Sequence, residues 1–301
     1  MRRTIWLGVA AAASLPPLSW AQNPGPERLS TVEIRAERVA DNLYVLFGFG
    51  GNIAVSFGEQ GVLLVDTQFP ELVPKIKAAI GELGGGDVDF AINTHWHYDH
   101  TEGNLALGRE GVWFVAHTES GRRLAMDNVI DPMSRPAFAQ PAFPPEARPV
   151  ATFDTRMRFH FNGEVIDVIH FGPAHTAGDA AVFFRAHNAV HMGDVFTPRG
   201  YPFVDVDNGG DIDGMITFCR AVLAELDENA IVIPGHGPVT TYADLARYTE
   251  MLQSVRDRVA ALIEAGASLE QVLAAQPTAA WDELYGQPAN FIDRVYTSLT
   301  R

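Results

Sequence analysis

The chain has 301 residues and a formal net charge of −15, and 47% of its residues are hydrophobic and 20% charged. This composition is ordinary for a folded globular protein and excludes disorder as the state of most of the chain. The acidic balance disfavours nucleic acid and anionic membrane surfaces as partners. The single cysteine, Cys219, excludes an internal disulfide bond, and its apolar helical surroundings indicate a buried structural thiol.

The N-terminus has the features of a secretory signal peptide. Arg2 and Arg3 precede an apolar run over residues 5–18, and residues 19–21 are typical of a small-x-small cleavage site. Two prolines interrupt the run, which is shorter than the roughly 20 residues of a membrane span. We expect a signal peptide over residues 1–21 and a periplasmic or secreted protein that does not bind a membrane after cleavage. Removal of two arginines and no acidic residue lowers the formal net charge to −17.

Short β-rich runs divided by Gly-rich turns predict hairpins in the first half of the chain. An amphipathic helix is expected over residues 72–83, and a second one, capped by Thr118, is expected to run to about residue 128. Six prolines between residues 131 and 150 predict an irregular surface loop, either a linker or a wall of a substrate cleft. The predicted strands of this half are residues 43–47, 53–57, 62–65, 90–93 and 112–116.

The second half repeats this order, with hairpins first and helices after them. Two such rounds predict an α/β fold in which two sheets pack face to face with helices outside, a four-layer αββα sandwich. We expect a single domain over residues 22–301. Its tail, residues 268–301, is predicted to be helical and to pack on the body, with dimer formation as the alternative. The predicted elements are strands at 157–161, 165–171, 180–184, 189–192 and 231–233, and helices at 213–226 and 242–265.

One short segment concentrates metal-binding residue types. Three of the ten histidines, together with an aspartate, lie within residues 95–100, directly after a predicted strand. Imidazole and carboxylate are ligands that Zn²⁺ accepts. In an extended stretch His95 and His97 project to the same side and can share one metal ion, while Asp99 and His100 can reach a second.

Three further candidates follow predicted strands in the second half. His175, Asp194 and His236 each have glycines nearby, which let the backbone turn sharply and direct a side chain into a cleft. Taken singly, such residues are more often surface or capping groups. Their occurrence together, after the histidine cluster, favours a common metal site. Histidines 117, 160, 170, 187 and 191 lack this context.

The His-x-His-x-Asp-His motif, the later His175, the Gly-Asp194 pair and the Gly-His236-Gly element resemble the ligand set of the metallo-β-lactamase superfamily, over residues 40 to 245. The resemblance implies two Zn²⁺ per chain, with iron or manganese as alternatives. It also implies an arrangement of the ligands: His95, His97 and His175 on one ion, Asp99, His100 and His236 on the other, and Asp194 bridging both.

Such a site implies hydrolysis. Two dications about 3.5–4 Å apart would hold a water between them and lower its pKa to roughly 7, so that a metal-bound hydroxide attacks a carbonyl or phosphoryl centre. Asp99 is the expected catalytic residue, orienting the hydroxide and passing its proton on. Asp66 and Asp179 are candidates to hold the imidazoles from outside, with turn capping as the alternative.

Substrate contacts are expected at three positions. Phe49 lies in a Gly-rich turn that resembles the flap of β-lactam-hydrolysing members. Arg199 is a candidate to take the place of their substrate-binding lysine, and Asn208 to polarise a carbonyl. However, the zinc β-lactamases with a comparable histidine set carry cysteine at the position of Asp194, and an aspartate there is more like glyoxalase II and lactonases.

We therefore expect a dinuclear zinc hydrolase that acts on an acyl C–N or C–O bond of a small-molecule substrate. β-Lactam hydrolysis is the leading hypothesis, and lactone or thioester hydrolysis is the alternative. Iron-dependent sulfur dioxygenases share this fold and are a further possibility, as is a non-catalytic periplasmic metal-binding protein. The sequence leaves the oligomeric state open.

Overall fold

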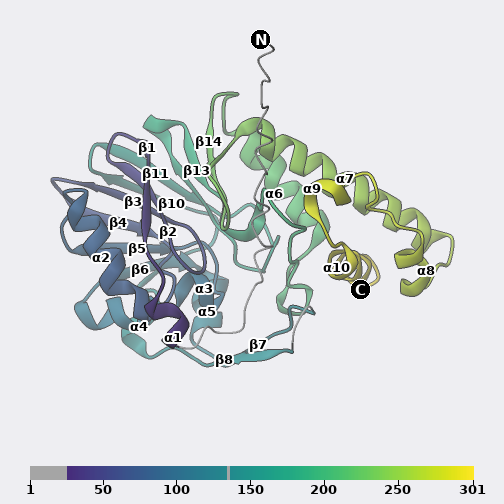
Figure 1. Cartoon of the computed structure of the whole chain (residues 1–301), viewed down its shortest axis with the longest axis horizontal. Coiled ribbons are helices and arrows are strands. Elements are labelled where there is room, and N and C mark those ends of the chain that lie inside the picture. The colour runs from purple at the N-terminus through teal and green to yellow at the C-terminus, as the bar shows by residue number, and fades with distance from the viewer. Residues whose placement is uncertain (1–25, 134–135) are drawn as a thin grey trace, which may run out of the picture.

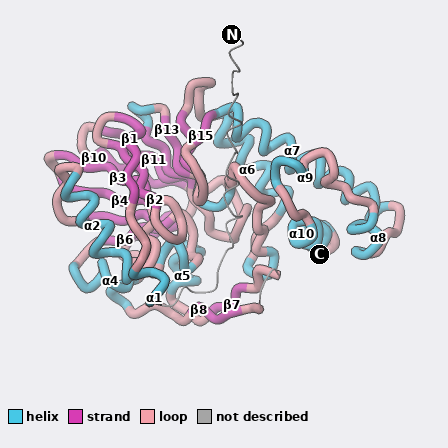
Figure 2. The backbone as a smooth tube through the Cα atoms, viewed as in Figure 1, coloured by secondary structure: helices cyan, strands magenta, loops and turns pink. Residues whose placement is uncertain are grey.

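Residues 26–133 and 136–301 are described by the structure, a computed structural model, and the predicted signal peptide lies outside this range. Two β-sheets lie face to face in the middle of the molecule, with helices on the outer side of each (Figures 1 and 2). Helix α2 (Val73–Glu82) lies outside the first sheet, and α6 (Ile212–Ala224) and α7 (Tyr242–Glu264) lie outside the second. The predicted αββα sandwich is confirmed.

The first sheet has seven strands. Its first four form an antiparallel meander, and the last three continue it in parallel. In sheet order the strands are β1 (Arg35–Ala40), β2 (Leu43–Phe47), β3 (Ile53–Gly58), β4 (Gly61–Val65), β5 (Val88–Asn93), β6 (Trp113–His117) and β9 (Ala151–Phe153).

The second sheet has six strands in sequence order, and all its pairs are antiparallel except β13 with β14. The strands are β10 (Arg156–Phe161), β11 (Glu164–Ile169), β12 (Ala181–Phe184), β13 (Ala189–His191), β14 (Ile231–Ile233) and β15 (Thr240–Thr241).

The period-two alternation of strand side chains explains why the apolar runs are continuous. In β4, Leu63 and Val65 enter the core between the two sheets, while Val62 and Leu64 enter the core under the helices. A third core lies between the second sheet and the helices α6 and α7. Burial on both faces of the sheets fixes the positions of the strand ends from which the site is built.

The tail consists of helices α8 (Leu269–Ala274), α9 (Asp282–Tyr285) and α10 (Ala289–Leu299). Phe291 and Val295 of α10 are buried in the same core as Val255 and Val259 of α7, so the tail packs on the body, on the right of Figure 1.

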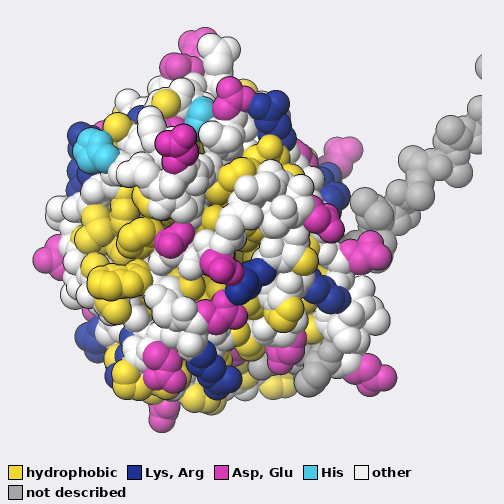
Figure 3. Space-filling view, turned by 90° about the vertical axis from the view of Figure 1, so that its left-hand side faces the viewer, with side chains coloured by type: hydrophobic (Ala, Val, Ile, Leu, Met, Phe, Trp, Pro, Cys, Tyr) yellow, Lys and Arg dark blue, Asp and Glu magenta, His cyan; other side chains and the backbone are white. Residues whose placement is uncertain are grey.

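Among the described residues, no helix is both long and apolar enough to cross a bilayer. The face at the left of Figure 1 carries apolar side chains among charged groups of both signs (Figure 3).

Two local expectations were wrong. Helix α5 (Thr118–Leu124) is capped by the ring of His117, whose Nδ1 accepts a hydrogen bond from the Glu119 amide at 3.3 Å, and not by Thr118. The Pro-rich segment is not wholly irregular, because β8 (Phe138–Gln140) lies between its prolines and pairs with β7 (Asn128–Ile130), which replaces the predicted end of α5. Strands β1, β9 and β15 carry too weak an apolar pattern to have been predicted.

Candidate metal centre

The seven predicted ligands meet at one end of the sandwich. His95 and His97 lie in the turn after β5, and Asp99 and His100 lie in the short helix α3 (Tyr98–Thr101) that follows it. The second sheet contributes the others from the segments that follow its strands: His175 after β11, Asp194 after β13 and His236 after β14. The fold thus brings together side chains that are far apart in the sequence.

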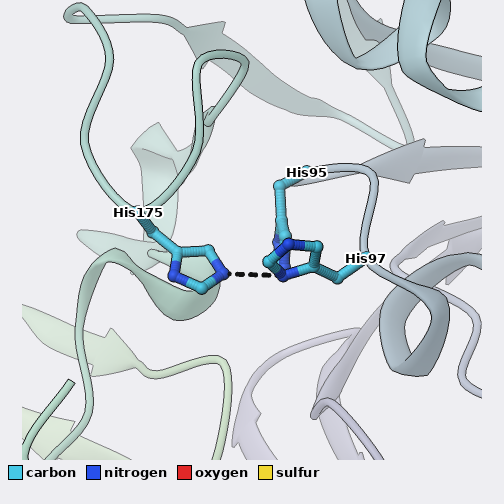
Figure 4. A group of neighbouring side chains, drawn as sticks. All are labelled: His95, His97 and His175. Carbon is cyan, nitrogen blue, oxygen red and sulfur yellow. Dashed lines mark hydrogen bonds between the residues drawn. The ribbon is translucent and has the colours of Figure 1, made fainter. Parts of the chain in front are cut away.

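The first group consists of His95, His97 and His175, whose ligand atoms lie within 4.8 Å of one another (Figure 4). Nδ1 of His97 is 2.9 Å from Nε2 of His175. Nε2 of His95 is buried and has no hydrogen-bond partner among the described residues. A buried, unpartnered ring nitrogen is unfavourable unless a cation accepts its lone pair, so this donor set fits a metal ion.

The second group consists of Asp99, His100 and His236. Nε2 of His100 is 3.1 Å from Nε2 of His236, which lies 3.3 Å from Oδ2 of Asp99. Asp194 lies between the two groups: its Oδ1 is 3.1 Å from Nε2 of His100, and its Oδ2 is 3.8 Å from Nε2 of His175. The carboxylate of Asp194 therefore faces both groups at once.

Each of the three histidines within residues 95–100 is held by a residue outside the two groups, which contacts the ring nitrogen that faces away from the other predicted ligands. Nδ1 of His100 lies 2.7 Å from Oδ2 of Asp66, and Nδ1 of His95 lies 3.0 Å from Oγ1 of Thr94. Nε2 of His97 lies 2.8 Å from Oδ2 of Asp205. Such contacts fix ring orientation and tautomer and leave the inner nitrogen free for a metal ion.

Asp66 holds this arrangement in place. Its side chain is fully buried and accepts hydrogen bonds from the amide and the hydroxyl of Thr94, both at 2.8 Å, in addition to its contact with His100. Its backbone adopts φ +66°, a left-handed conformation that is rare for residues other than glycine, asparagine and aspartate. Asp66 therefore contacts the imidazole of a predicted ligand, His100, which is the contact that one of its two sequence interpretations expected.

Two glycines permit the close packing of the centre. A Cβ atom on Gly51 would lie 2.3 Å from Cε1 of His100, and one on Gly235 would lie 2.0 Å from Oδ1 of Asp194. No side chain fits at either position without displacing a ligand. The absence of a Cβ atom at these two positions is therefore a requirement of the site.

The two groups differ in their electrostatics. Burial and the neighbouring imidazoles hold the pKa of His95 well below its usual range, and burial lowers that of His175 to about 4. Burial also opposes protonation of His236, but Asp194 and Asp99 more than offset it and raise its pKa to about 9. The pKa of His100 is raised in the same way by Asp194, Asp66 and Asp99 against the effect of burial. The imidazoles of His95 and His175 are therefore neutral at pH 7, and in the second group acidic residues balance the charge of His100 and His236.

The contacts of three other predicted positions are made with residues outside the two groups. Asp179 caps the turn after His175, accepting from the amide and hydroxyl of Thr176 at 2.8 and 2.9 Å, and burial raises its pKa to about 7. The ring of Phe49 packs against Phe69, with centroids 5.9 Å apart, and Arg28 covers it. Arg199 is exposed.

The amide of Asn208 departs from its expected role. Its nitrogen donates to both carboxylate oxygens of Asp205, at 3.0 and 2.9 Å, so it does not face a substrate carbonyl. Sequence reasoning missed Asp205 itself, which lies 108 positions after His97 in a segment without a recognisable motif. It also missed Phe203, whose carbonyl oxygen lies 2.7 Å from Nδ1 of His175.

Comparisons with known proteins agree with this arrangement. A sequence model of the family described as the Metallo-beta-lactamase superfamily matches residues 46–244. A hydroxyacylglutathione hydrolase from Polaromonas sp. is 27% identical over 163 residues, and the match spans 52% of each chain, so about half the length of that relative. A probable metallo-hydrolase from Streptococcus pyogenes is 26% identical over 64% of this chain and 81% of its own.

A solved structure shares the fold. A metallo-beta-lactamase from Pontibacter korlensis superposes with a TM-score of 0.60 at 18% sequence identity, covering 73% of this chain and 99% of its own. The family model spans all seven predicted ligands, from the histidine cluster after β5 to His236 after β14. By this match and by its fold and ligand geometry, the chain belongs to the metallo-β-lactamase superfamily.

Proposed function

We propose that the chain is a dinuclear zinc hydrolase that cleaves an acyl bond of a small molecule, either a C–N or C–O bond or the C–S bond of a thioester. The observation that carries this proposal is the position of Asp194 between two groups of three ligands. One group offers three imidazoles, and the other two imidazoles and a carboxylate, which are ligand types that Zn²⁺ prefers. The named metallo-hydrolase relatives support the same class of reaction.

When bound, a pair of such ions lowers the pKa of a coordinated water and polarises the oxygen of the scissile group. The residues of the chain supply the rest. Burial favours the neutral acid form of Asp99, but His100 and His236 more than offset this and keep its pKa below the usual range. Asp99 is therefore a carboxylate at neutral pH and accepts the proton that the attacking water loses. The imidazoles of the histidine cluster are held in fixed orientations beside Asp99 by Asp66, Thr94 and Asp205.

For the scissile bond, the β-lactam amide is our first candidate. Two features support it: the predicted export of the chain, which would bring a periplasmic enzyme into contact with such compounds, and the Gly-rich turn carrying Phe49, which adjoins the site. In this turn the Gly51 amide donates to the carbonyl oxygen of Asp99 at 2.9 Å. Part of the substrate would lie along the turn.

Hydrolysis of a lactone or thioester is the second candidate, and specific observations favour it. The residue between the two groups is Asp194, a carboxylate and not a thiolate. In addition, one relative of the chain is named as a hydroxyacylglutathione hydrolase. Both candidates use the same attack on an acyl carbon and differ in the leaving group.

The test is a hydrolysis screen with zinc-loaded protein against nitrocefin, an acyl-homoserine lactone and a thioester. His97→Ala should lower turnover of the accepted substrate by at least about 100-fold, because it removes a ligand from the first group. His160→Ala is the matched control, since this exposed histidine lies outside the site and its removal should leave turnover unchanged. Equal activity of the His97→Ala variant, or fewer than two zinc ions per active chain, would contradict the proposal.

A further inference from the structure

His97 is held by Asp205 on the side that faces away from the other ligands. Nε2 of His97 is 2.8 Å from Oδ2 of Asp205, while Nδ1 faces His175. A carboxylate only accepts hydrogen bonds, so the proton of the neutral imidazole stays on Nε2 and Nδ1 keeps the lone pair that a metal ion needs. Asp205 is 1% exposed, so its own orientation depends on protein groups and not on solvent.

The amide of Asn208 sets the orientation of Asp205. Its nitrogen donates to both oxygens of that carboxylate and, at 3.0 Å, to the carbonyl oxygen of Val129. Its Oδ1 accepts a hydrogen bond from Nη1 of Arg123 at 2.8 Å. A guanidinium only donates hydrogen bonds and a carboxylate only accepts them. If the Asn208 amide were rotated by 180°, its NH₂ group would face the Arg123 donor and its oxygen would face the Asp205 carboxylate, and both contacts would be unfavourable. Arg123 thereby fixes the direction in which Asn208 donates.

This chain of contacts joins the two halves of the molecule. Arg123 lies in α5, beside the first sheet, and Asn208 ends the 3-10 turn Val206–Asn208 after the second sheet's β13. The guanidinium carbon of Arg123 is 5.8 Å from the centre of the Trp96 ring. Gln140 of β8 donates to the carbonyl oxygen of Trp96 at 2.8 Å. The residue before His97 is thus fixed by the same region that fixes its imidazole.

We propose that Asn208 and Arg123 are positioning residues for the metal centre, acting on His97 through Asp205. The proposal rests on the proposed function, because it concerns how firmly the first ligand group holds a metal ion. Without Asn208, two hydrogen bonds to the buried carboxylate are lost and Asp205 is free to turn, so His97 loses its fixed orientation. Loss of such outer contacts lowers metal affinity by about 10–100-fold.

The experiment compares four variants with the unaltered protein. Two variants, Asn208→Ala and Arg123→Met, each remove one residue from the series of hydrogen bonds that leads to His97. Arg123→Lys keeps the positive charge but has a single donor group. Arg185→Met is the matched control, since Arg185 is 26% exposed against 19% for Arg123 and pairs with Asp167, away from the ligands. We would measure apparent zinc affinity by chelator competition, the visible spectrum of the Co²⁺-loaded protein, and the unfolding midpoint without metal.

We expect Asn208→Ala to weaken zinc binding by about 10–100-fold and to change the Co²⁺ spectrum. Arg123→Met should act in the same direction with a smaller effect, Arg123→Lys should recover part of the affinity, and Arg185→Met should lower only the unfolding midpoint. Unaltered zinc affinity and Co²⁺ spectra in both Asn208→Ala and Arg123→Met would overturn the inference. If Asn208→Ala does not fold, the two Arg123 variants decide it. Failure of the unaltered protein to bind zinc would instead overturn the proposed function.

Discussion

A methyl group added at Gly51 should disable the second ligand group. The Cβ atom of an alanine would lie 2.3 Å from Cε1 and 2.4 Å from Nδ1 of His100, so one of the two must move by on the order of 1 Å to restore van der Waals contact. Neither Gly51 nor His100 moves freely. Nδ1 of His100 is held 2.7 Å from Oδ2 of Asp66. The Gly51 amide donates a hydrogen bond to the carbonyl oxygen of Asp99, and the Gly51 carbonyl accepts one from the side chain of Gln68. The φ angle of Gly51 is not positive, so alanine is allowed there as far as the backbone is concerned.

For Gly51→Ala we expect zinc binding weakened by about 10–100-fold and turnover lowered by about 100-fold, because a ligand displaced by about 1 Å no longer fits the centre. Overpacking should also lower the free energy of unfolding by about 1–3 kcal/mol. Gly81→Ala is the matched control: its Cβ atom would meet nothing within 4 Å on α2, so it should stabilise the fold by about 0.5–1 kcal/mol. Chelator competition and denaturant unfolding measure these effects. A Gly51→Ala protein that binds two zinc ions as tightly as the unaltered one would refute the steric reasoning.

Three further predictions concern protons, the outer contacts and the tail. The raised pKa of His236, about 9, stabilises the metal-free fold fully below the unfolded value near 6.5 and less as pH rises through 9. Zinc must displace this proton, so the affinity for zinc should fall as pH drops from 9 to 7. Calorimetry in buffers of different ionisation enthalpy should detect protons released on zinc binding. If no protons are released, His236 is not a protonated ligand of the metal-free site. In Asp66→Asn, the new NH₂ group faces at least one of the three buried donors that Asp66 accepts from, so zinc binding measured by chelator competition should weaken by about 10–100-fold. Unchanged zinc affinity would show that Asp66 does not position His100. Phe291→Ala should cost about 3–5 kcal/mol in denaturant unfolding while two zinc ions still bind; a loss below about 1 kcal/mol would contradict the packing of α10.

The features predicted well are those with a period or a dense motif. Strands such as β4 show apolar runs because both faces are buried, and residues 95–100 concentrate ligand types beyond chance. Glycines near Asp194 and His236 predicted sharp backbone turns, and Gly193 and Gly237 indeed have φ angles of +52° and +95°. The close packing of Gly235 against Asp194 is an additional finding of the structure. Such local signals were sufficient to predict the sandwich and to assemble the seven candidate ligands.

The features that were missed depend on long-range partners. Asp205 has no local pattern that distinguishes it from a surface aspartate, and its role arises only from the approach of His97 from the other sheet. Asn208 was singled out for the wrong contact, because its two neighbours, Arg123 and Asp205, become visible only in three dimensions. Strand β8 was missed because prolines flank it on both sides and because it forms only by pairing with β7, which the sequence around it does not indicate.

Both ligand groups draw on both halves of the chain. His95 and His97 precede the β10–β11 turn at Asn162, whereas His175 follows it, and the second group is divided in the same way between Asp99 with His100 and His236. A gene cut beside the exposed Gly163 of this turn would therefore encode two fragments, neither of which retains three predicted ligands for either ion. Zinc-dependent turnover on mixing them would report reassembly of the two sheets, and the chain would serve as its own complementation reporter.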